Sequence, residues 1–322
     1  MKIRHDVHNH NIFSNCCNDP SASTDAFVAK EVELGNKIFG LSNHIWDESV
    51  KGASYWYSKQ TITKAEEAKA SLAKAPKELK CLFGAESEYF HCYDRLGMSV
   101  EGAKRFDYML IPHSHQHMRN QVLWDLPEIQ EMRAKIAADV QAALPYLAED
   151  TVKVMTNALQ EAHLKKYIEE QKTDLGKYMT EAAVKSFNDL CANETFIKMC
   201  ATVPTSIAHP FAFCGIPHEI KNSFLIQIPD EVLYECFKRA KAIGAYCEIN
   251  CAAVTEHGMD LEANQLMRVF ANAKKAGCQF TFGTDSHSVK SLELVRVGDL
   301  VAEHLGLTKA DIAEYLQDGV EE

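Results

Sequence analysis

The chain has 322 residues, of which 46% are hydrophobic and 25% charged, and this composition excludes disordered, collagen-like and fibrous proteins. Its 34 Lys and Arg against 45 Asp and Glu give a formal net charge of −11, so no broad nucleic-acid-binding surface is expected. The 14 histidines stand out against only 3 tryptophans, and several of them fall in short clusters that the predicted function has to explain.

The cysteines and the amino terminus indicate the cellular compartment of the protein. The 11 cysteines are odd in number and show no CxxC spacing, which favours a reduced protein over a disulfide framework. The first residues lack the roughly 7–15-residue apolar core of a signal peptide. No apolar run approaches the ~20 residues of a membrane span. We therefore expect a cytoplasmic protein that does not contact membranes.

Seven short apolar segments are predicted as strands, and most are followed by a helix-like stretch. They are, in chain order, Lys2–Val7, Lys37–Leu41, Cys81–Gly84, Asp107–Ile111, Thr205–Ala208, Ala245–Ile249 and Gln279–Gly283. Strands that alternate with helices indicate parallel β/α units, and hence a barrel or an open α/β sheet.

The predicted helices are clearest late in the chain and in one long interval. Apolar residues recur at helical spacing from Asp230 to Gly244 and again from Leu266 to Gly277, each time just before a strand. The segment 118–203, between the fourth and fifth predicted strands, is rich in Ala, Glu, Lys and Leu and is too long to be a single crossover connection. We predict a helical insertion there, which is either a packing subdomain or a lid over the site.

Histidine and acidic side chains follow six of the seven predicted strands. His8 and His10 end the first strand and point to the same side, because strand side chains alternate. After the fourth strand come His113, His115 and His117, of which we expect one to bind metal and the others to contact substrate or form hydrogen bonds. The other candidate ligands at strand ends are His44, Glu86, His209, Asp285 and His287. The carboxyl ends of parallel strands meet at one rim, so these side chains should lie together.

The types of the candidate ligand residues limit which metal ions the site can bind. Calcium and magnesium prefer shells made only of oxygen, whereas mixed imidazole and carboxylate ligands suit Zn²⁺, Mn²⁺ or Fe²⁺. At least eight candidate ligands exceed what one tetrahedral ion can use. The sequence therefore predicts a centre of two or three divalent ions.

In their order, these motifs resemble those of the PHP (polymerase and histidinol phosphatase) family of metal-dependent phosphoesterases. The motifs are His8-x-His10, Ser42-Asn43-His44, Gly84-x-Glu86-x-Glu88, the histidine run around His115, Ala208-His209-Pro210 and Gly283-Thr284-Asp285-Ser286-His287. The resemblance covers Met1 to about His287 without the insertion. It implies an α/β fold in which residues 1–322 form one distorted, TIM-like (β/α)7 barrel domain, with the insertion 118–203 between its fourth and fifth strands.

The resemblance also implies a trinuclear centre in which Glu86 bridges two ions. One ion would take the further ligands His8, His10 and Asp285, the second His115 and His209, and the third His44 and His287. Whether His115 or His113 is the ligand stays open, because either histidine can be in register with the preceding strand.

The sequence departs from the family pattern at Cys16, where many members have a histidine six residues after the second His of the HxH pair. A thiolate can bind zinc or iron. Cys16 therefore either completes the third metal site or is an inert buried cysteine.

The implied function is hydrolysis of a small phosphate monoester, as in histidinol phosphatases, with no nucleic-acid partner. A metal-bridged hydroxide would attack phosphorus, and metal ions would offset the charge of the chain and of the substrate. The predicted catalytic residues are Glu86, Asp285 and His115. The predicted substrate contacts are His113 or His117 at the leaving group and Arg119 at the phosphate.

Two alternatives stay open. An amidohydrolase-type metal hydrolase also begins with HxH and ends with an Asp, but Glu86 on the third strand, the lack of a lysine on the fourth and His287 two residues after Asp285 argue against it. The other is a non-catalytic, metal-binding barrel, which only Cys16 supports. Assays on phosphate esters, amides and lactones would separate these possibilities.

Overall fold

A seven-stranded, wholly parallel sheet forms the centre of the molecule. The computed structural model describes residues 1–54, 56–90, 94–115, 127–170, 172–213 and 218–322. The strands lie in the order β10-β9-β8-β7-β4-β3-β2. Their bounds are β2 His5–Asp6, β3 Ile38–Leu41, β4 Lys80–Glu86, β7 Tyr108–Pro112, β8 Thr205–Ala208, β9 Tyr246–Asn250 and β10 Phe280–Gly283.

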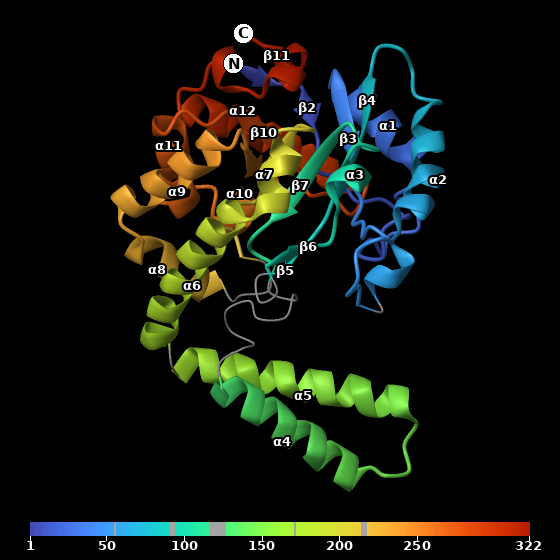
Figure 1. Ribbon diagram of the computed structural model, residues 1–322, viewed down its shortest axis with the longest axis vertical. Helices are drawn as coiled ribbons and strands as arrows, with labels where there is room; N and C mark the ends of the chain where they lie inside the picture. Colours follow the sequence, from blue (N-terminus) through green and yellow to red (C-terminus); the bar gives the residue numbers. More distant parts are fainter. Residues whose placement is uncertain (55, 91–93, 116–126, 171, 214–217) are drawn as a thin grey trace.

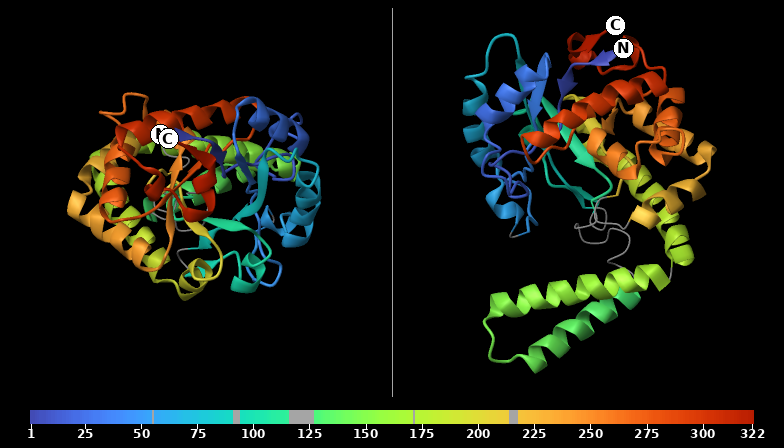
Figure 2. Two further views of the ribbon diagram at one scale, coloured as in Figure 1. Left: turned by 90° about the horizontal axis from the view of Figure 1, so that it is seen from above. Right: turned by 180° about the vertical axis from the view of Figure 1, so that it is seen from behind.

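The two edges of the sheet meet, so that it nearly closes into a barrel (Figures 1 and 2). Beyond β2, the Val7 N–H donates to the Phe282 carbonyl at 3.0 Å. The Asp285 N–H donates to the carbonyl of His8 at 2.8 Å. These bonds join the first and last strands of the sheet, which confirms the predicted TIM-like (β/α)7 barrel.

Helices surround the barrel. They are α1 Thr24–Glu33, α2 Ile62–Leu72, α3 Val100–Ala103, α6 Lys172–Ala192, α7 Glu194–Cys200, α8 His218–Gln227, α9 Asp230–Ala242, α10 Cys251–His257, α11 Gln265–Lys275 and α12 Val295–His304. The predicted stops of α9 and α11 are present, because Gly244 and Gly277 follow them with φ of 79° and 80°, a conformation that favours glycine. Among the described residues, no helix is long and apolar enough to cross a membrane.

The first predicted strand, Lys2–Val7, is divided in the structure. Its first part, β1 (Lys2–Ile3), pairs antiparallel with β11 (Val320–Glu321) near the end of the chain, while β2 pairs with β3. A second short pair, β5 (Tyr89–Phe90) and β6 (Arg95–Leu96), follows β4. The remaining short elements are the 3₁₀ helices η1 Tyr57–Lys59, η3 Lys290–Leu294, η4 Lys309–Asp311 and η5 Glu314–Gly319.

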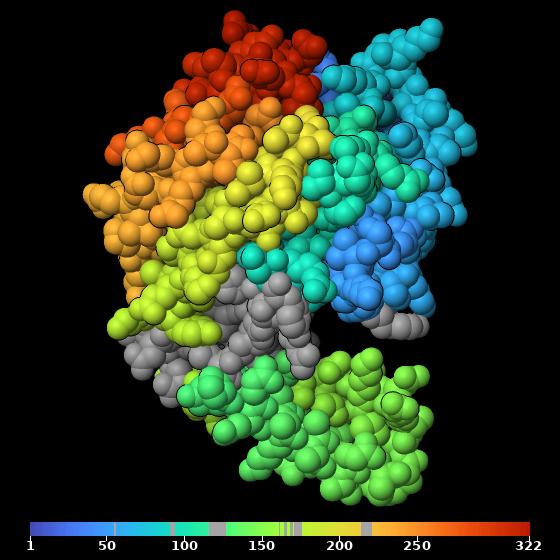
Figure 3. Space-filling model, in the orientation of Figure 1, coloured from blue at the N-terminus to red at the C-terminus, as the bar shows by residue number. Residues whose placement is uncertain are grey.

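A two-helix hairpin lies apart from the barrel, within the predicted insertion between β7 and β8. Its helices are α4 (Pro127–Ala143) and α5 (Glu149–Glu170), and α6 and α7 return the chain to the barrel. The hairpin lies on the side toward which the strands end, and the space-filling view shows a hollow between it and the barrel (Figures 1 and 3). Its exposed apolar side chains include Tyr146 and Val154, which are 79% and 68% exposed.

Inside the barrel, the Tyr108 ring occupies the space that two glycines leave. A Cβ atom added at Gly40 or Gly84 would overlap this ring, whose hydroxyl donates to the carbonyl of Val7 at 2.7 Å. We expect Gly84→Ala to lower the free energy of unfolding by about 1–3 kcal/mol, the usual cost of overpacking a core, as measured by urea denaturation. Gly176→Ala is the control, because there the added Cβ comes too close only to the flexible end of the Gln227 side chain and makes an ordinary contact with Ser223. Equal midpoints for both variants would contradict the packing argument.

Candidate metal centre

Glu86, the last residue of β4, lies at the centre of the converging strand ends. Its side chain is 1% exposed. One carboxylate oxygen, Oε2, lies 3.4 Å from Nε2 of His8 and 3.3 Å from Nε2 of His10, the two histidines that follow β2. The same oxygen lies 3.2 Å from Nδ1 of His44, which follows β3. Three imidazoles from two strand ends therefore face one carboxylate oxygen.

The other carboxylate oxygen of Glu86, Oε1, faces a second pair of histidines. It lies 3.4 Å from Nε2 of His115, which follows β7, and 3.4 Å from Nε2 of His209, which follows β8. Both histidines are buried. Glu86 is thus shared between two groups that can each hold a metal ion, His8–His10–Glu86 and Glu86–His115–His209.

Asp285, which follows β10, also faces the two histidines of the first group. Its Oδ1 lies 3.5 Å from Nε2 of His8 and 3.3 Å from Nε2 of His10, and its side chain is 22% exposed. The backbone of Asp285 has φ of 53° and that of His209 has φ of 29°, both unusual for residues other than glycine. Such strain is often stored where side chains must be aimed at a functional site.

Three buried groups fix the direction of the histidine rings. Nδ1 of His8 lies 2.6 Å from Glu248, and Nδ1 of His115 lies 2.9 Å from both oxygens of Glu88. Nδ1 of His209 lies 2.8 Å from the Ser114 hydroxyl, which itself donates to the His209 carbonyl at 3.3 Å. We assign the ring proton to Nδ1 in each case, which leaves the Nε2 lone pairs directed into the centre.

The arrangement fits metal ions, because lone pairs of histidine ring nitrogens face each other across short distances. The Nε2 atoms of His8 and His10 are 3.0 Å apart, and those of His115 and His209 are 3.1 Å apart. With Nδ1 carrying the proton, such pairs and the adjoining Glu86 carboxylate repel one another unless a cation lies between them. The donor set of nitrogen and oxygen atoms is one that Zn²⁺, Mn²⁺ and Fe²⁺ accept.

The pKa shifts of the buried histidines and carboxylates describe the centre when it binds protons in place of metal ions. Burial opposes charge on His8, but Glu248, Asp285 and Glu86 raise its pKa well above the ordinary value. Burial opposes ionisation of Glu86, but the neighbouring histidines, chiefly His44 and His115, hold its pKa well below the ordinary value. Without a cation, His8 is therefore held as an imidazolium beside the ionised carboxylate of Glu86.

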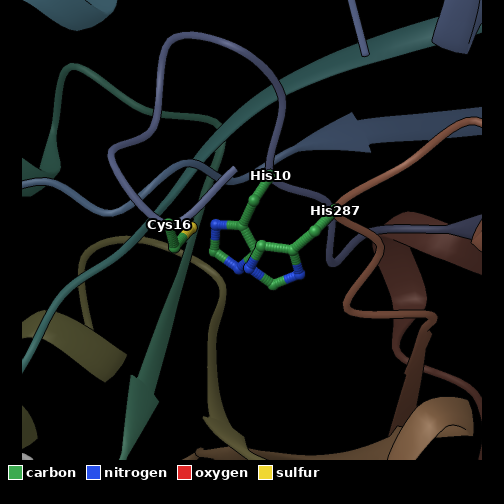
Figure 4. Close-up of side chains that lie close together, drawn as sticks. All are labelled: His10, Cys16 and His287. Carbon is green, nitrogen blue, oxygen red and sulfur yellow. The ribbon is translucent and has the colours of Figure 1, made fainter. Parts of the chain in front are cut away.

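A third group lies at the edge of the centre and consists of His10, Cys16 and His287 (Figure 4). His287 is 39% exposed and stacks on His10 with ring centroids 4.7 Å apart. Burial alone would raise the pKa of Cys16, but His10, His287 and His44 lower it to about 3. Cys16 is therefore held as a thiolate beside imidazoles.

The predicted substrate contacts are not all found at this centre. His113 is fully buried among Phe187, Phe211 and Phe213, and its Nε2 accepts the backbone N–H of Phe211 at 2.9 Å. This environment gives His113 a packing role rather than the predicted contact with substrate. The other two predicted contacts, His117 and Arg119, lie outside the described residues.

Two residues of the centre were missed by reasoning from the sequence. Glu248 on β9 and Glu88 after β4 are fully buried and orient ligand histidines from behind. Glu248 also accepts the backbone N–H of His209 at 2.6 Å. The signal for Glu248 was its position near the carboxyl end of a strand. The signal for Glu88 was its two-residue spacing from Glu86, which puts both side chains on the same side of an extended chain.

Replacing Glu248 by glutamine is expected to weaken metal binding by roughly 10–100-fold, the usual effect of losing a carboxylate behind a ligand histidine. The amide keeps the shape of the side chain but no longer fixes the His8 proton at Nδ1. Affinity would be measured by competition with a chelator. Glu256→Gln is the control, because Glu256 pairs with Lys221 and is 62% exposed. An unchanged affinity in Glu248→Gln would refute this role.

The fold and the site together define a TIM-like (β/α)7 barrel with clustered His and Glu groups for metal ions at the carboxyl ends of its strands. No protein-family model and no curated protein matches the chain. Among solved structures, it is similar to the histidinol phosphate phosphatase of Lactococcus lactis subsp. lactis Il1403, crystallised with zinc, L-histidinol and phosphate. The two chains share 12% identity over 96% of this chain and 95% of that one, with a TM-score of 0.49.

Proposed function

We propose that the protein is a metal-dependent phosphoesterase that hydrolyses a small phosphate monoester, in the manner of a histidinol phosphatase. The observation that supports this most directly is the sharing of Glu86 between two ligand groups, with one oxygen facing His8 and His10 and the other facing His115 and His209. Ligand groups bridged by one carboxylate are suited to a pair of ions a few ångströms apart, which is the arrangement used for in-line displacement at phosphorus.

Divalent ions in this centre would supply an activated water and would neutralise charge on the phosphate. The residues of the chain hold and aim the site. Glu86 provides the shared anion, and Asp285 is a second carboxylate that faces His8 and His10. Asp285 is also the more exposed of the two carboxylates, so it stands nearest to an entering substrate.

His115 joins the centre to a buried network. Its Nδ1 donates to Glu88, which also accepts the hydroxyl of Tyr57, and that hydroxyl lies 3.2 Å from Nδ1 of His44. Movement of a proton at any of these atoms changes the strength of the hydrogen bonds at the others. We propose that this network keeps His115 neutral and directed at Glu86; in keeping with this, burial outweighs Glu88 and Glu86 and lowers the pKa of His115.

We also favour the lid over the packing subdomain for the insertion. The α4–α5 hairpin lies on the side toward which the strands end (Figure 1), and a hollow separates it from the barrel (Figure 3). A wall in this position would limit the size of the leaving group and exclude water from the site.

The proposal is tested by removing metal from the purified protein, reloading it with Zn²⁺, Mn²⁺ or Fe²⁺ and following phosphate release. The substrates would be L-histidinol phosphate, a nucleoside monophosphate, a sugar phosphate and phosphotyrosine, with an amide and a lactone as controls. We expect metal-dependent hydrolysis of at least one phosphate ester and two to three metal equivalents by plasma mass spectrometry. If no ester is hydrolysed with any of the metals, the proposal fails; hydrolysis of only the amide or lactone would favour the amidohydrolase alternative.

A further inference from the structure

The loop that carries Cys16 is built to hold it in place. The Cys17 N–H donates to the Ser14 carbonyl at 3.1 Å and closes a turn around the cysteine. Gln60, which is buried, accepts the Ser14 hydroxyl at 3.1 Å and the Asn15 N–H at 2.8 Å. The Ser14 hydroxyl also contacts the Cys16 sulfur at 3.1 Å. Cys16 therefore lies in a turn that hydrogen bonds of its neighbours hold in place.

The atoms around the Cys16 sulfur are ligand atoms. The sulfur, one nitrogen of His10 and one nitrogen of His287 all lie within 4.8 Å of one another. Figure 4 shows a ring nitrogen of His10 turned toward the sulfur. Nδ1 of His10 is buried and has no hydrogen-bond partner among the described residues, whereas its Nε2 faces Glu86 and Asp285. A buried ring nitrogen without a partner is costly unless something binds it.

We infer that Cys16, His10 and His287 form a metal position whose thiolate selects a thiophilic ion, making the centre chemically unequal across its positions. This rests on the proposed metal centre and deepens it, because the two groups around Glu86 offer only nitrogen and oxygen. Because Nε2 of His10 faces the first ligand group, His10 would serve both positions as an imidazolate, and its remaining ring proton would be released to solvent when metal binds. A thiolate favours zinc, cobalt(II) or ferrous iron, while manganese and magnesium prefer oxygen ligands. Three protein ligands at the exposed edge also leave a coordination place for substrate.

The neighbouring cysteine gives a matched control. Cys17 is half-buried, and its sulfur lies 3.2 Å from the His287 carbonyl and 3.8 Å from the Asp19 carbonyl, both of which can accept its S–H. It belongs to none of the ligand groups found among the described residues. Substituting Cys17 therefore changes the loop without removing a ligand.

The test is a cobalt(II) titration of the full-length, metal-stripped protein, read by absorption spectroscopy. We expect a near-ultraviolet thiolate-to-cobalt charge-transfer band that saturates at one equivalent. Cys16→Ser should remove this band, keep visible cobalt bands from the other positions and weaken one position by at least the roughly tenfold that even an outer contact is worth. Cys16→His should restore the position without the band, and Cys17→Ser should behave as the unaltered protein.

The inference is overturned if the band is missing, if it survives in Cys16→Ser or if Cys17→Ser removes it. It is also overturned if cobalt does not bind. These outcomes are separate from the fate of the proposed function: a Cys16-dependent band in a protein that hydrolyses no phosphate ester would refute the phosphoesterase and retain the metal position. Hydrolysis of a phosphate ester by a protein that shows no Cys16-dependent band would refute the metal position and retain the phosphoesterase.

Discussion

Glu86→Gln is expected to lower phosphate-ester hydrolysis by about 10³-fold or more, because ions in such a centre supply several kcal/mol of transition-state stabilisation. The substitution keeps the size of the side chain and removes the one anion that both ligand groups share. Each carboxylate oxygen lies 3.2–3.4 Å from the imidazole nitrogens it faces, so no single group can keep its ion unaffected.

The effect of Glu86→Gln would be measured as kcat/KM on the best substrate and as bound metal per chain. Far-UV circular dichroism would show that the variant is folded, which we expect because the amide can donate to the Nε2 lone pairs that face it. Glu101→Gln on α3 is the control, because its side chain is 80% exposed. Retention of both metal and activity in Glu86→Gln would show that this carboxylate is not the bridge.

Metal removal is expected to reverse the way in which stability depends on pH. In the metal-free protein the pKa of His8 is raised well above its usual value, so the stability it contributes is present below about pH 6.5 and is lost as the pH rises through the raised pKa. The pKa of Asp285 is lowered by His8 and His10 despite burial, so its contribution is present above about pH 4 and is lost in stronger acid.

Metal ions act in the opposite sense on the alkaline side, because they bind the deprotonated ligands and displace these protons. The difference in Tm between loaded and metal-free protein should therefore grow from about pH 6 to about pH 8. Calorimetry with zinc or with a chelator would measure it, and zinc titrations in two buffers of different ionisation enthalpy would count the protons released. Glu86→Gln should show a smaller metal-induced shift. A difference that stays constant with pH, or no proton release, would contradict the assignment.

The strands were predictable because each is a short apolar run that ends in polar residues. The predicted Cys81–Gly84 lies within β4, and Thr205–Ala208 matches β8. The division of Lys2–Val7 was not predictable, because it depends on a partner, Val320–Glu321, at the far end of the sequence. Local pattern specifies an element, but pairing across the whole chain decides where it breaks.

The ligand residues were predictable for a similar reason, since parallel strands end at one rim and the histidines stand at those ends. The choice between His113 and His115 was not, because it depends on the direction in which the chain leaves β7 at Pro112. His115 reaches Glu86, while His113 turns into the phenylalanines. The role of Glu248 depends on its distance to His8, which no sequence pattern expresses.

The hydrogen bond between Asp285 and His8, which closes the barrel, bears on when the metal centre can form during synthesis of the chain. One ligand group takes His8 and His10 from the beginning of the sequence, and Asp285 faces both from near its end. A metal centre that includes Asp285 would not be complete until this residue has left the ribosome, so metal would be acquired only after the last strand of the sheet has been made. Bound ions would then act as a cross-link between the first and last strands of the barrel, and their loss would weaken its closure.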